Sequence, residues 1–223
     1  MNKDSKSKVK SYLVLGIAFI TLATVLGIYM KFLGNPSLNT SLSYEIYSLI
    51  NSSHSLHSFM LVISYSASVL AVGVYLLIML IYVMVRTSKD DIRRRYLIIT
   101  IIALILADVV VAILKFSLRI PRPPWGIESS GYTYPSGHVT RSSVLAILIP
   151  KVFGGKLGNY LMVITWVWVF LTCLSRVSLG AHYVMDVVGG VFTGVGSTAL
   201  LLSIYEFLRT SVVIVREEAS KRS

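Results

Sequence analysis

The strongest constraint on the fold of this chain is a series of long apolar runs, which are separated by short segments that hold most of the charge. Hydrophobic residues make up 55% of the 223 residues and charged residues only 14%, whereas about a quarter of a typical soluble domain is charged. A run of about 20 apolar residues can cross a bilayer as a helix, because a helix satisfies its own backbone groups in lipid. The pattern therefore predicts an all-α, polytopic membrane protein.

We expect one domain over residues 1–223, built as a bundle of six transmembrane helices. The expected spans cover about residues 12–33, 56–85, 96–114, 138–153, 160–174 and 183–208. The fourth span is short, and the sequence GGKLGN is expected to form a tight turn after it. Between the first two spans, SYEIYSLI predicts a short amphipathic helix on the extracytoplasmic membrane surface.

The first apolar run also fits a cleaved signal peptide, because basic residues precede it. It is longer than a usual signal core, however, and it lacks a small-x-small cleavage site. These two features favour an uncleaved first helix.

The distribution of lysine and arginine predicts the orientation in the membrane. With six spans and the N-terminus inside, fifteen of the 21 lysines and arginines lie on the inner side, as the positive-inside rule requires. Both termini are then cytoplasmic, and the plasma membrane is the expected location. The net charge of +11 follows from these short basic segments, so no nucleic-acid partner is expected. The single cysteine, Cys173, lies in an apolar run and predicts neither a disulfide nor a metal site.

Six basic residues depart from this pattern: Lys31 lies near the end of the first span, and the other five gather with two histidines at the extracytoplasmic ends of the helices. These five are Lys115, Arg119, Arg122, Arg141 and Arg176, with His138 and His182. A cluster of cations at a membrane boundary is costly unless an anion neutralises it, and only Asp186 and Glu128 are near enough in sequence to do so. Arginine binds phosphate oxygens in bidentate fashion. Ser136 and Gly137, at an expected helix start, add backbone N–H donors. The cluster predicts a phosphate-binding site.

The histidines and one aspartate indicate the chemistry. His182 and Asp186 are four residues apart, which places them on one face if the segment is helical. A carboxylate beside an imidazole fixes its tautomer and raises its basicity. The sequence contains neither a carboxylate cluster for a two-metal centre nor a Gly-x-x-x-x-Gly-Lys loop, so we expect no metal and no cofactor. Phosphoryl transfer through a phosphohistidine fits these residues, with one histidine as nucleophile and the other as acid.

Three segments carry a family resemblance. KFSLRIPRP (115–123), PSGH (135–138) and SRVSLGAHYVMD (175–186) resemble the three-part signature of the type 2 phosphatidic acid phosphatase superfamily. Its pattern is Lys, six residues, Arg-Pro; then Pro-Ser-Gly-His; then Ser-Arg, five residues, His, three residues, Asp. Every fixed position is present in order, and the motif region covers residues 115–186.

The resemblance implies a role for each matching residue. His182 would be the nucleophile, Asp186 its orienting carboxylate and His138 the acid for the leaving group. The residues that would bind the phosphate are Lys115, Arg122, Ser136, Gly137 and Arg176, with Arg119 as an additional candidate outside the fixed pattern. Arg141, one helical turn beyond His138, is either a further phosphate ligand or an interfacial anchor. Asp108 is expected to pair with a polar group in the bundle.

The implied function is that of an integral membrane lipid phosphatase with its site at the extracytoplasmic face. A polyprenyl diphosphate or monophosphate is the first substrate expected, and phosphatidate or phosphatidylglycerophosphate is the alternative. The expected partners are this lipid phosphate and the bilayer, with no obligate protein partner. Two other functions stay open: a lipid phosphotransferase with the same phosphohistidine, and an anion transporter, which would not need the two histidines and the aspartate at these spacings.

Overall fold

The regular structure is helical in the part of the chain that the computed structural model describes, which is residues 3–86, 91–128 and 130–222. Only a single bridge between Pro121 and Tyr132 departs from this within those ranges. The helices are α1 (Lys3–Phe32), α2 (Ser37–Asn51), α3 (His54–Ser66), α4 (Val69–Arg86), α5 (Ile92–Leu118), α6 (Gly137–Phe153), α7 (Gly155–Ser178) and α8 (Val184–Arg222). The expectation of an all-α fold is confirmed.

Five of the described helices are long and apolar enough to cross a membrane. The five segments are Asp4–Phe32, Val69–Arg86, Ile92–Leu118, Gly155–Ser178 and Val184–Ser211. The expected span at 138–153 corresponds to α6, which has 17 residues. At 1.5 Å per residue α6 is about 26 Å long, slightly less than the roughly 30 Å of a hydrocarbon core. The basic segment between the second and third expected spans, residues 86–95, lies partly outside the described residues.

The expected second span, 56–85, is wrong as a single helix, because α3 ends at Ser66 and α4 begins at Val69. Side chains satisfy the backbone groups that the break exposes. The Tyr75 hydroxyl donates to the carbonyl of Ser66 over 2.9 Å, and the Ser68 hydroxyl accepts the N–H of Ala71 over 3.3 Å. With these partners the break costs little even where water is scarce.

The six-residue turn expected at GGKLGN is also wrong. Gly154 alone separates α6 from α7, and the remaining residues begin α7. Gly154 has φ 65°, which is a left-handed conformation that glycine adopts without strain. Its N–H donates to the carbonyl of Pro150 over 2.9 Å. One glycine therefore both ends α6 and reverses the chain.

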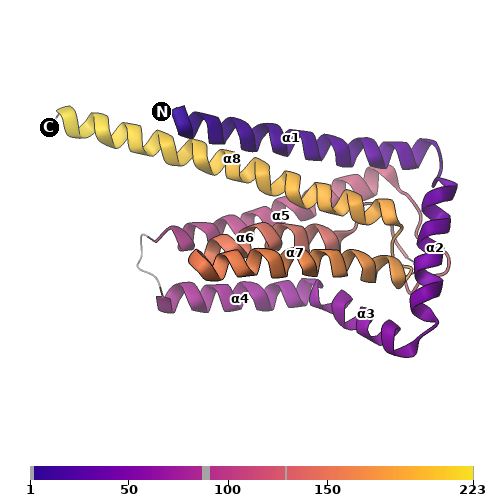
Figure 1. Cartoon of the computed structure of the whole chain (residues 1–223). Helices are drawn as coiled ribbons and strands as arrows, with labels where there is room; N and C mark the ends of the chain where they lie inside the picture. The colour runs from indigo at the N-terminus through magenta and orange to yellow at the C-terminus, as the bar shows by residue number, and fades with distance from the viewer. Residues whose placement is uncertain (1–2, 87–90, 129, 223) are drawn as a thin grey trace.

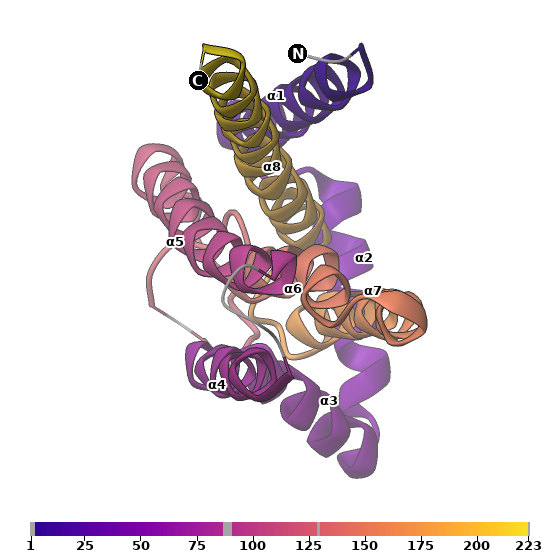
Figure 2. The ribbon, with the colours of Figure 1, turned by 90° about the vertical axis from the view of Figure 1, so that its left-hand side faces the viewer.

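The helices form a bundle in which α6 is central. Figure 1 shows α1 lying along α8, with α2 across the end of the bundle where α6 and α8 begin. Figure 2 shows α6 with α5 on one side and α7 on the other. The side chains of Val144, Leu145, Ala146 and Leu148 on α6 are fully buried. The start of α1 and the end of α8 lie at the end of the bundle opposite α2 (Figure 1).

The amphipathic helix expected at SYEIYSLI is α2, which is longer than expected and crosses the bundle end. Its buried polar side chains bind the first turn of α8. The Ser43 hydroxyl accepts the N–H of Val184, and the Asn39 carbonyl oxygen accepts the N–H of Met185, each over 3.0 Å. These bonds satisfy N–H groups that have no partner within α8, so α2 holds the start of α8 in place.

Two glycines let α8 approach α6 closely. A methyl group added to Gly194 would lie 2.5 Å from the carbonyl oxygen of Thr140, and one added to Gly190 would lie 2.8 Å from that of Ser136. Real contacts of this kind are longer, so a side chain at either position would push the helices apart. Small residues are used in this way where helices pack inside membranes.

We expect Gly194→Ala to lower the unfolding free energy by about 1–3 kcal/mol, which is the usual cost of overpacking. Thermal unfolding of the purified protein in detergent measures this. Gly73→Ala is the matched control, because a methyl group there meets nothing within 4 Å. Equal midpoints for the Gly194→Ala variant and the wild type would show that the contact between α6 and α8 is not tight.

Candidate active site

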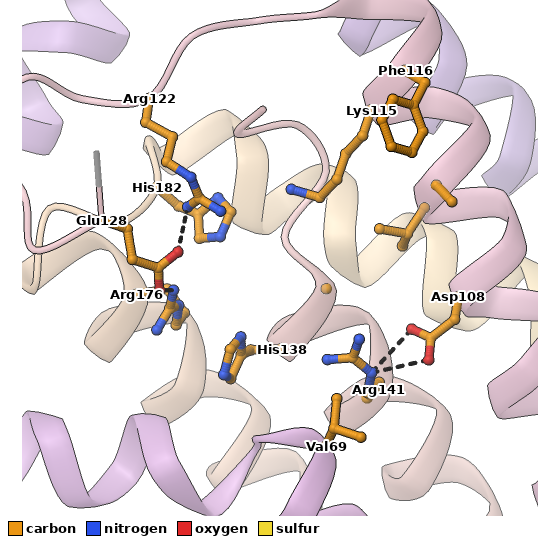
Figure 3. Close-up of a pocket in the computed structure, with 13 residues that line it drawn as sticks. Val69, Asp108, Lys115, Phe116, Arg122, Glu128, His138, Arg141, Arg176 and His182 are labelled. Atoms are coloured by element: carbon orange, nitrogen blue, oxygen red, sulfur yellow. Dashed lines mark hydrogen bonds and ion pairs between the residues drawn. The ribbon is translucent and has the colours of Figure 1, made fainter. Parts of the chain in front are cut away.

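Four helices, the α5–α6 loop and the turn before α8 meet around a cavity of about 490 Å³ at the end of the bundle that α2 covers. Lys115 comes from the last turn of α5, and Arg176 from the last turn of α7. His138 lies in the first turn of α6, and His182 lies in the turn before α8. The loop between α5 and α6 contributes Arg122. Figure 3 shows these side chains around one space, so the structure brings together residues that the sequence places far apart.

His182 is held by Asp186 and Thr133 on one side of its ring. Its Nδ1 lies 3.4 Å from Oδ2 of Asp186 and 3.1 Å from the hydroxyl oxygen of Thr133. The Thr133 hydroxyl donates to the same carboxylate oxygen. All three side chains are almost completely buried. An N–H at Nδ1 therefore has acceptors in place, and Nε2 is left for the cavity that the ring borders.

The pairing of His182 with Asp186 is as expected, but its geometry is not that of two residues on one helix. His182 precedes α8, and the backbone N–H of Tyr183 donates to Oδ2 of Asp186 over 2.7 Å. Asp186 thus caps the start of its own helix and orients the imidazole with the same carboxylate.

The charge state of His182 follows from its surroundings. Burial lowers the pKa of the imidazole well below its usual value, and the positive charges of Arg176 and Lys115 lower it further. The ring is therefore neutral at pH 7. A neutral imidazole keeps the lone pair that a nucleophile or base needs.

Thr133 has no counterpart in the sequence-based prediction. It is fully buried in the loop before α6, and its N–H donates to the carbonyl of Ile120 over 2.9 Å. Lys115 holds the same stretch, because its ammonium donates to the carbonyls of Tyr132 and Thr133 over 2.5 Å and 3.3 Å. In the sequence, Thr133 is marked only by its position two residues before Pro135, the first residue of the PSGH motif.

The groups expected to bind phosphate lie beside this histidine. Arg122 is fixed by the carbonyls of Ser130 and Ala181, each 2.8 Å from a guanidinium nitrogen. Nη1 of Arg176 donates to the hydroxyl of Ser64 over 2.6 Å. Both arginines keep further N–H groups for the cavity that they line.

Several polar groups near the start of α6 lack a partner within the described residues. The hydroxyl of Ser136 and Nε of Arg176 are buried without a hydrogen bond. Ser136 precedes α6 but makes no side-chain cap, so its hydroxyl does not satisfy the first N–H groups of α6. Buried polar atoms are normally satisfied, and a helix start presents N–H groups to anions. This set of donors fits the oxygens of a phosphate.

Arg119 lies apart from the other predicted residues. It ends α5 in a left-handed conformation with φ 54°, and its Nε donates to the carbonyl of Phe116 over 3.1 Å. It is not among the residues that line the cavity. The structure gives Arg119 a place in the closing turn of α5.

Glu128 places a carboxylate between two of the expected phosphate ligands. One oxygen lies 2.7 Å from Nη1 of Arg122, and the other accepts a hydrogen bond from Arg176. Burial alone would raise the pKa of Glu128, but the charge and hydrogen bond of Arg176 and the charge of Arg122 outweigh it and lower the pKa. An internal anion therefore holds both guanidinium groups when no phosphate is bound. The sequence had indicated Glu128 only as a counter-charge.

Asp108 has the polar partner that was expected for it. Its carboxylate oxygens lie 3.0 Å and 3.1 Å from Nε of Arg141. Both residues line the cavity, on the side away from Glu128 (Figure 3).

The five long apolar helices indicate an integral membrane protein. At one end of their bundle lies a buried site rich in cations. The profile of the PAP2 superfamily matches residues 96–209, which is just over half of the chain. The protein therefore belongs to the PAP2 superfamily. This confirms the resemblance seen in the three motifs, and it agrees with the expectation of a phosphoric ester hydrolase.

Two solved structures share the fold. The PAP2 type phosphatidylglycerolphosphate phosphatase from Bacillus subtilis superposes with a TM-score of 0.70 at 20% identity, over 89% of this chain and 96% of that one. LpxE from Aquifex aeolicus superposes with a TM-score of 0.62 at 23% identity, over 75% of this chain and 96% of that one.

A lipid A 4'-phosphatase from Porphyromonas gingivalis is 26% identical over 86 residues. The match covers 39% of this chain and 35% of that protein, so it spans about a third of the relative's length.

We expect Thr133→Val to lower kcat by roughly tenfold to a hundredfold, because a hydrogen bond to a charged group contributes about 1.5–3 kcal/mol. Valine keeps the shape of the side chain but cannot bridge Nδ1 and the carboxylate. Steady-state phosphate release measures the effect. Thr133→Ser, which keeps the hydroxyl, is the control and should retain most of the activity. An active Thr133→Val variant would remove Thr133 from the catalytic arrangement.

We expect Glu128→Gln to make vanadate and inorganic phosphate inhibit at severalfold lower concentration. Each anion competes with the Glu128 carboxylate for Arg122 and Arg176, and glutamine has no charge with which to compete. Inhibition curves at constant pH and ionic strength measure this. Glu45→Gln, at an exposed position on α2, controls for the loss of one negative charge. Unchanged or weaker inhibition would show that Glu128 does not occupy the anion position.

Proposed function

We propose that this PAP2 protein hydrolyses a phosphomonoester or diphosphate of a membrane lipid, without a metal, through a phosphohistidine at His182. One observation carries the proposal. Nδ1 of His182 is engaged by Asp186 and Thr133 while the same ring borders a cavity with cationic walls. A neutral, oriented imidazole beside fixed guanidinium groups is the arrangement that attack on a phosphoryl group requires.

In the first step, Nε2 of His182 attacks phosphorus while the bond from phosphorus to the leaving oxygen breaks. His138, which lines the same cavity (Figure 3), is protonated when the negative charge of the bound substrate offsets the neighbouring arginines, and it donates this proton to that oxygen. Asp186 stabilises the positive charge on the phosphorylated imidazole. The phosphoryl oxygens are bound by Lys115, Arg122 and Arg176, with donors from Ser136 and Gly137 at the start of α6.

In the second step, water attacks the phosphohistidine. His138, now without its proton, accepts a proton from the water as the new bond to phosphorus forms. The bond from phosphorus to Nε2 breaks, inorganic phosphate is released, and both histidines return to their starting protonation states. The three cations bind the same phosphoryl oxygens in both steps.

The cavity walls support an amphiphilic substrate. Besides the charged groups, the cavity is lined by Val69 at the start of α4 and by Val111, Ala112 and Phe116 on one face of α5. Val69 and Phe116 are 65% and 68% exposed, on helices whose outer faces are apolar. The break between α3 and α4 places Val69 at this edge. An apolar tail can therefore leave the cavity between α4 and α5 and remain in lipid.

Two classes of lipid fit this site. A polyprenyl diphosphate or monophosphate is the first, since such carriers are dephosphorylated on the extracytoplasmic face. Phosphatidate or phosphatidylglycerophosphate is the second, and the fold shared with the phosphatidylglycerolphosphate phosphatase favours it. Both classes present a terminal phosphate at the boundary between membrane and water.

We further propose six spans, with α6 as the short central one, in the plasma membrane. Both termini are then cytoplasmic and the site faces the extracytoplasmic side. Two observations support this orientation. The site and the two chain ends lie at opposite ends of the bundle (Figure 1), and most lysines and arginines fall on the side of the termini.

The test is phosphate release from a panel of polyprenyl, glycerolipid and soluble phosphates, with and without excess EDTA. The wild type should release phosphate in EDTA, and His182→Ala should lower turnover by at least a thousandfold while the protein remains folded. His54→Ala, at an exposed position, is the matched control. Undiminished turnover in His182→Ala would refute the nucleophile. Transfer of labelled phosphate to an acceptor other than water would identify a phosphotransferase instead.

A further inference from the structure

Arg141 belongs to the cavity but not to the arrangement around His182. It lies one helical turn beyond His138 on α6. Its partner, Asp108, lies on the same face of α5 as Lys115, two turns earlier. The side chains of Arg141 and Asp108 are 17% and 42% exposed. An ion pair with this much exposure contributes little to stability, so stability alone does not explain its place in the cavity.

Only one edge of the Arg141 guanidinium is used by Asp108. Both carboxylate oxygens approach Nε, which leaves the two terminal nitrogens. These nitrogens lie against the first turn of α6, because a methyl group added to Gly137 would be 3.6 Å from each of them. In Figure 3 they point away from Asp108 and into the space between His138 and Lys115. Arg141 thus presents a pair of N–H donors with fixed orientation to the cavity.

The location of Arg141 relative to His138 indicates which part of a substrate it meets. Arg122, Arg176 and Glu128 lie on one side of His138, and Arg141 lies on the other (Figure 3). The general acid protonates the leaving oxygen, so it stands between the transferred phosphoryl group and the rest of the substrate. Arg141 is therefore on the side of the leaving group.

We propose that Arg141, oriented by Asp108, is a specificity-determining residue that binds a second phosphate group on the leaving side of the substrate. This rests on the proposed phosphatase function. A guanidinium edge with two parallel donors matches the oxygens of a phosphate. The second phosphate can be the inner one of a diphosphate or the phosphodiester of a phosphatidylglycerophosphate. In either case the enzyme prefers a substrate with two phosphates over one with a single phosphate and the same tail.

The experiment compares kcat/KM within two substrate pairs, each with matched tails. One pair is a polyprenyl diphosphate and its monophosphate, and the other is phosphatidylglycerophosphate and phosphatidate. In Arg141→Gln we expect the preference for the two-phosphate member to fall at least tenfold in one pair. The pair that responds identifies the source of the second phosphate. An unchanged preference in both pairs would overturn the proposal, whatever happens to the absolute rates.

Further variants separate orientation from charge. Arg141→Lys keeps the charge without the paired donors, and Asp108→Asn keeps the arginine but weakens the contact that orients it. Both should show a smaller loss of preference, about threefold to tenfold. Arg209→Gln, at an exposed arginine on α8 that does not line the cavity, controls for the loss of one positive charge. The same loss in Arg209→Gln as in Arg141→Gln would mean that overall charge, and not Arg141, sets the preference.

A binding measurement keeps this proposal distinct from the proposed function. Inorganic pyrophosphate should raise the thermal unfolding midpoint of the wild type at lower concentration than orthophosphate does, and Arg141→Gln should remove that difference. This readout needs no turnover. If no substrate is hydrolysed but the pyrophosphate preference depends on Arg141, the phosphatase proposal fails and the second anion site stands. Equal binding of the two anions by the wild type would refute the second anion site.

Discussion

The carboxylate of Asp186 is the group on which the rest of the site depends. It accepts hydrogen bonds from the hydroxyl of Thr133 and the N–H of Tyr183, and it faces Nδ1 of His182. The backbone carbonyl of Asp186 accepts the N–H of Ser136, just before α6. One residue therefore links the α5–α6 loop, the start of α6 and the start of α8. All three side-chain contacts of Asp186 are made by Oδ2, so they fix the position of this oxygen and leave His182 few alternative positions.

The cations of the site are kept together by carboxylates that each engage only part of a guanidinium group. Glu128 lies between Arg122 and Arg176, and Asp108 binds the Nε edge of Arg141. Uncompensated cations at a membrane boundary would repel one another, while fully paired ones would have no capacity for a substrate. Partial pairing meets both requirements. It also divides the cavity into two cationic sides with His138 between them, which fits a substrate with a transferred and a retained phosphate.

The packing of the helical bundle sets the positions of the helix ends, and these ends form most of the site. α6 is short and buried, and the glycines of α8 allow the two helices to approach within backbone contact. α2 then crosses the bundle end and caps α8 through Asn39 and Ser43. The break between α3 and α4 opens the apolar side of the cavity at Val69. A rigid scaffold thus carries a site made mostly of helix ends and one loop, with an apolar edge for a lipid tail.

The sequence by itself determined the class of protein and the residues of the three motifs, because apolar run length and motif spacing are local properties of the chain. It could not determine the break after Ser66, the place of Arg119 outside the cavity, or the role of Thr133. These depend on contacts between distant residues, such as Thr133 with Asp186, 53 positions apart, and Arg176 with Ser64, 112 positions apart. Only the tertiary structure decided which cations face Glu128 and which faces Asp108, because packing sets the direction of a side chain and sequence spacing does not.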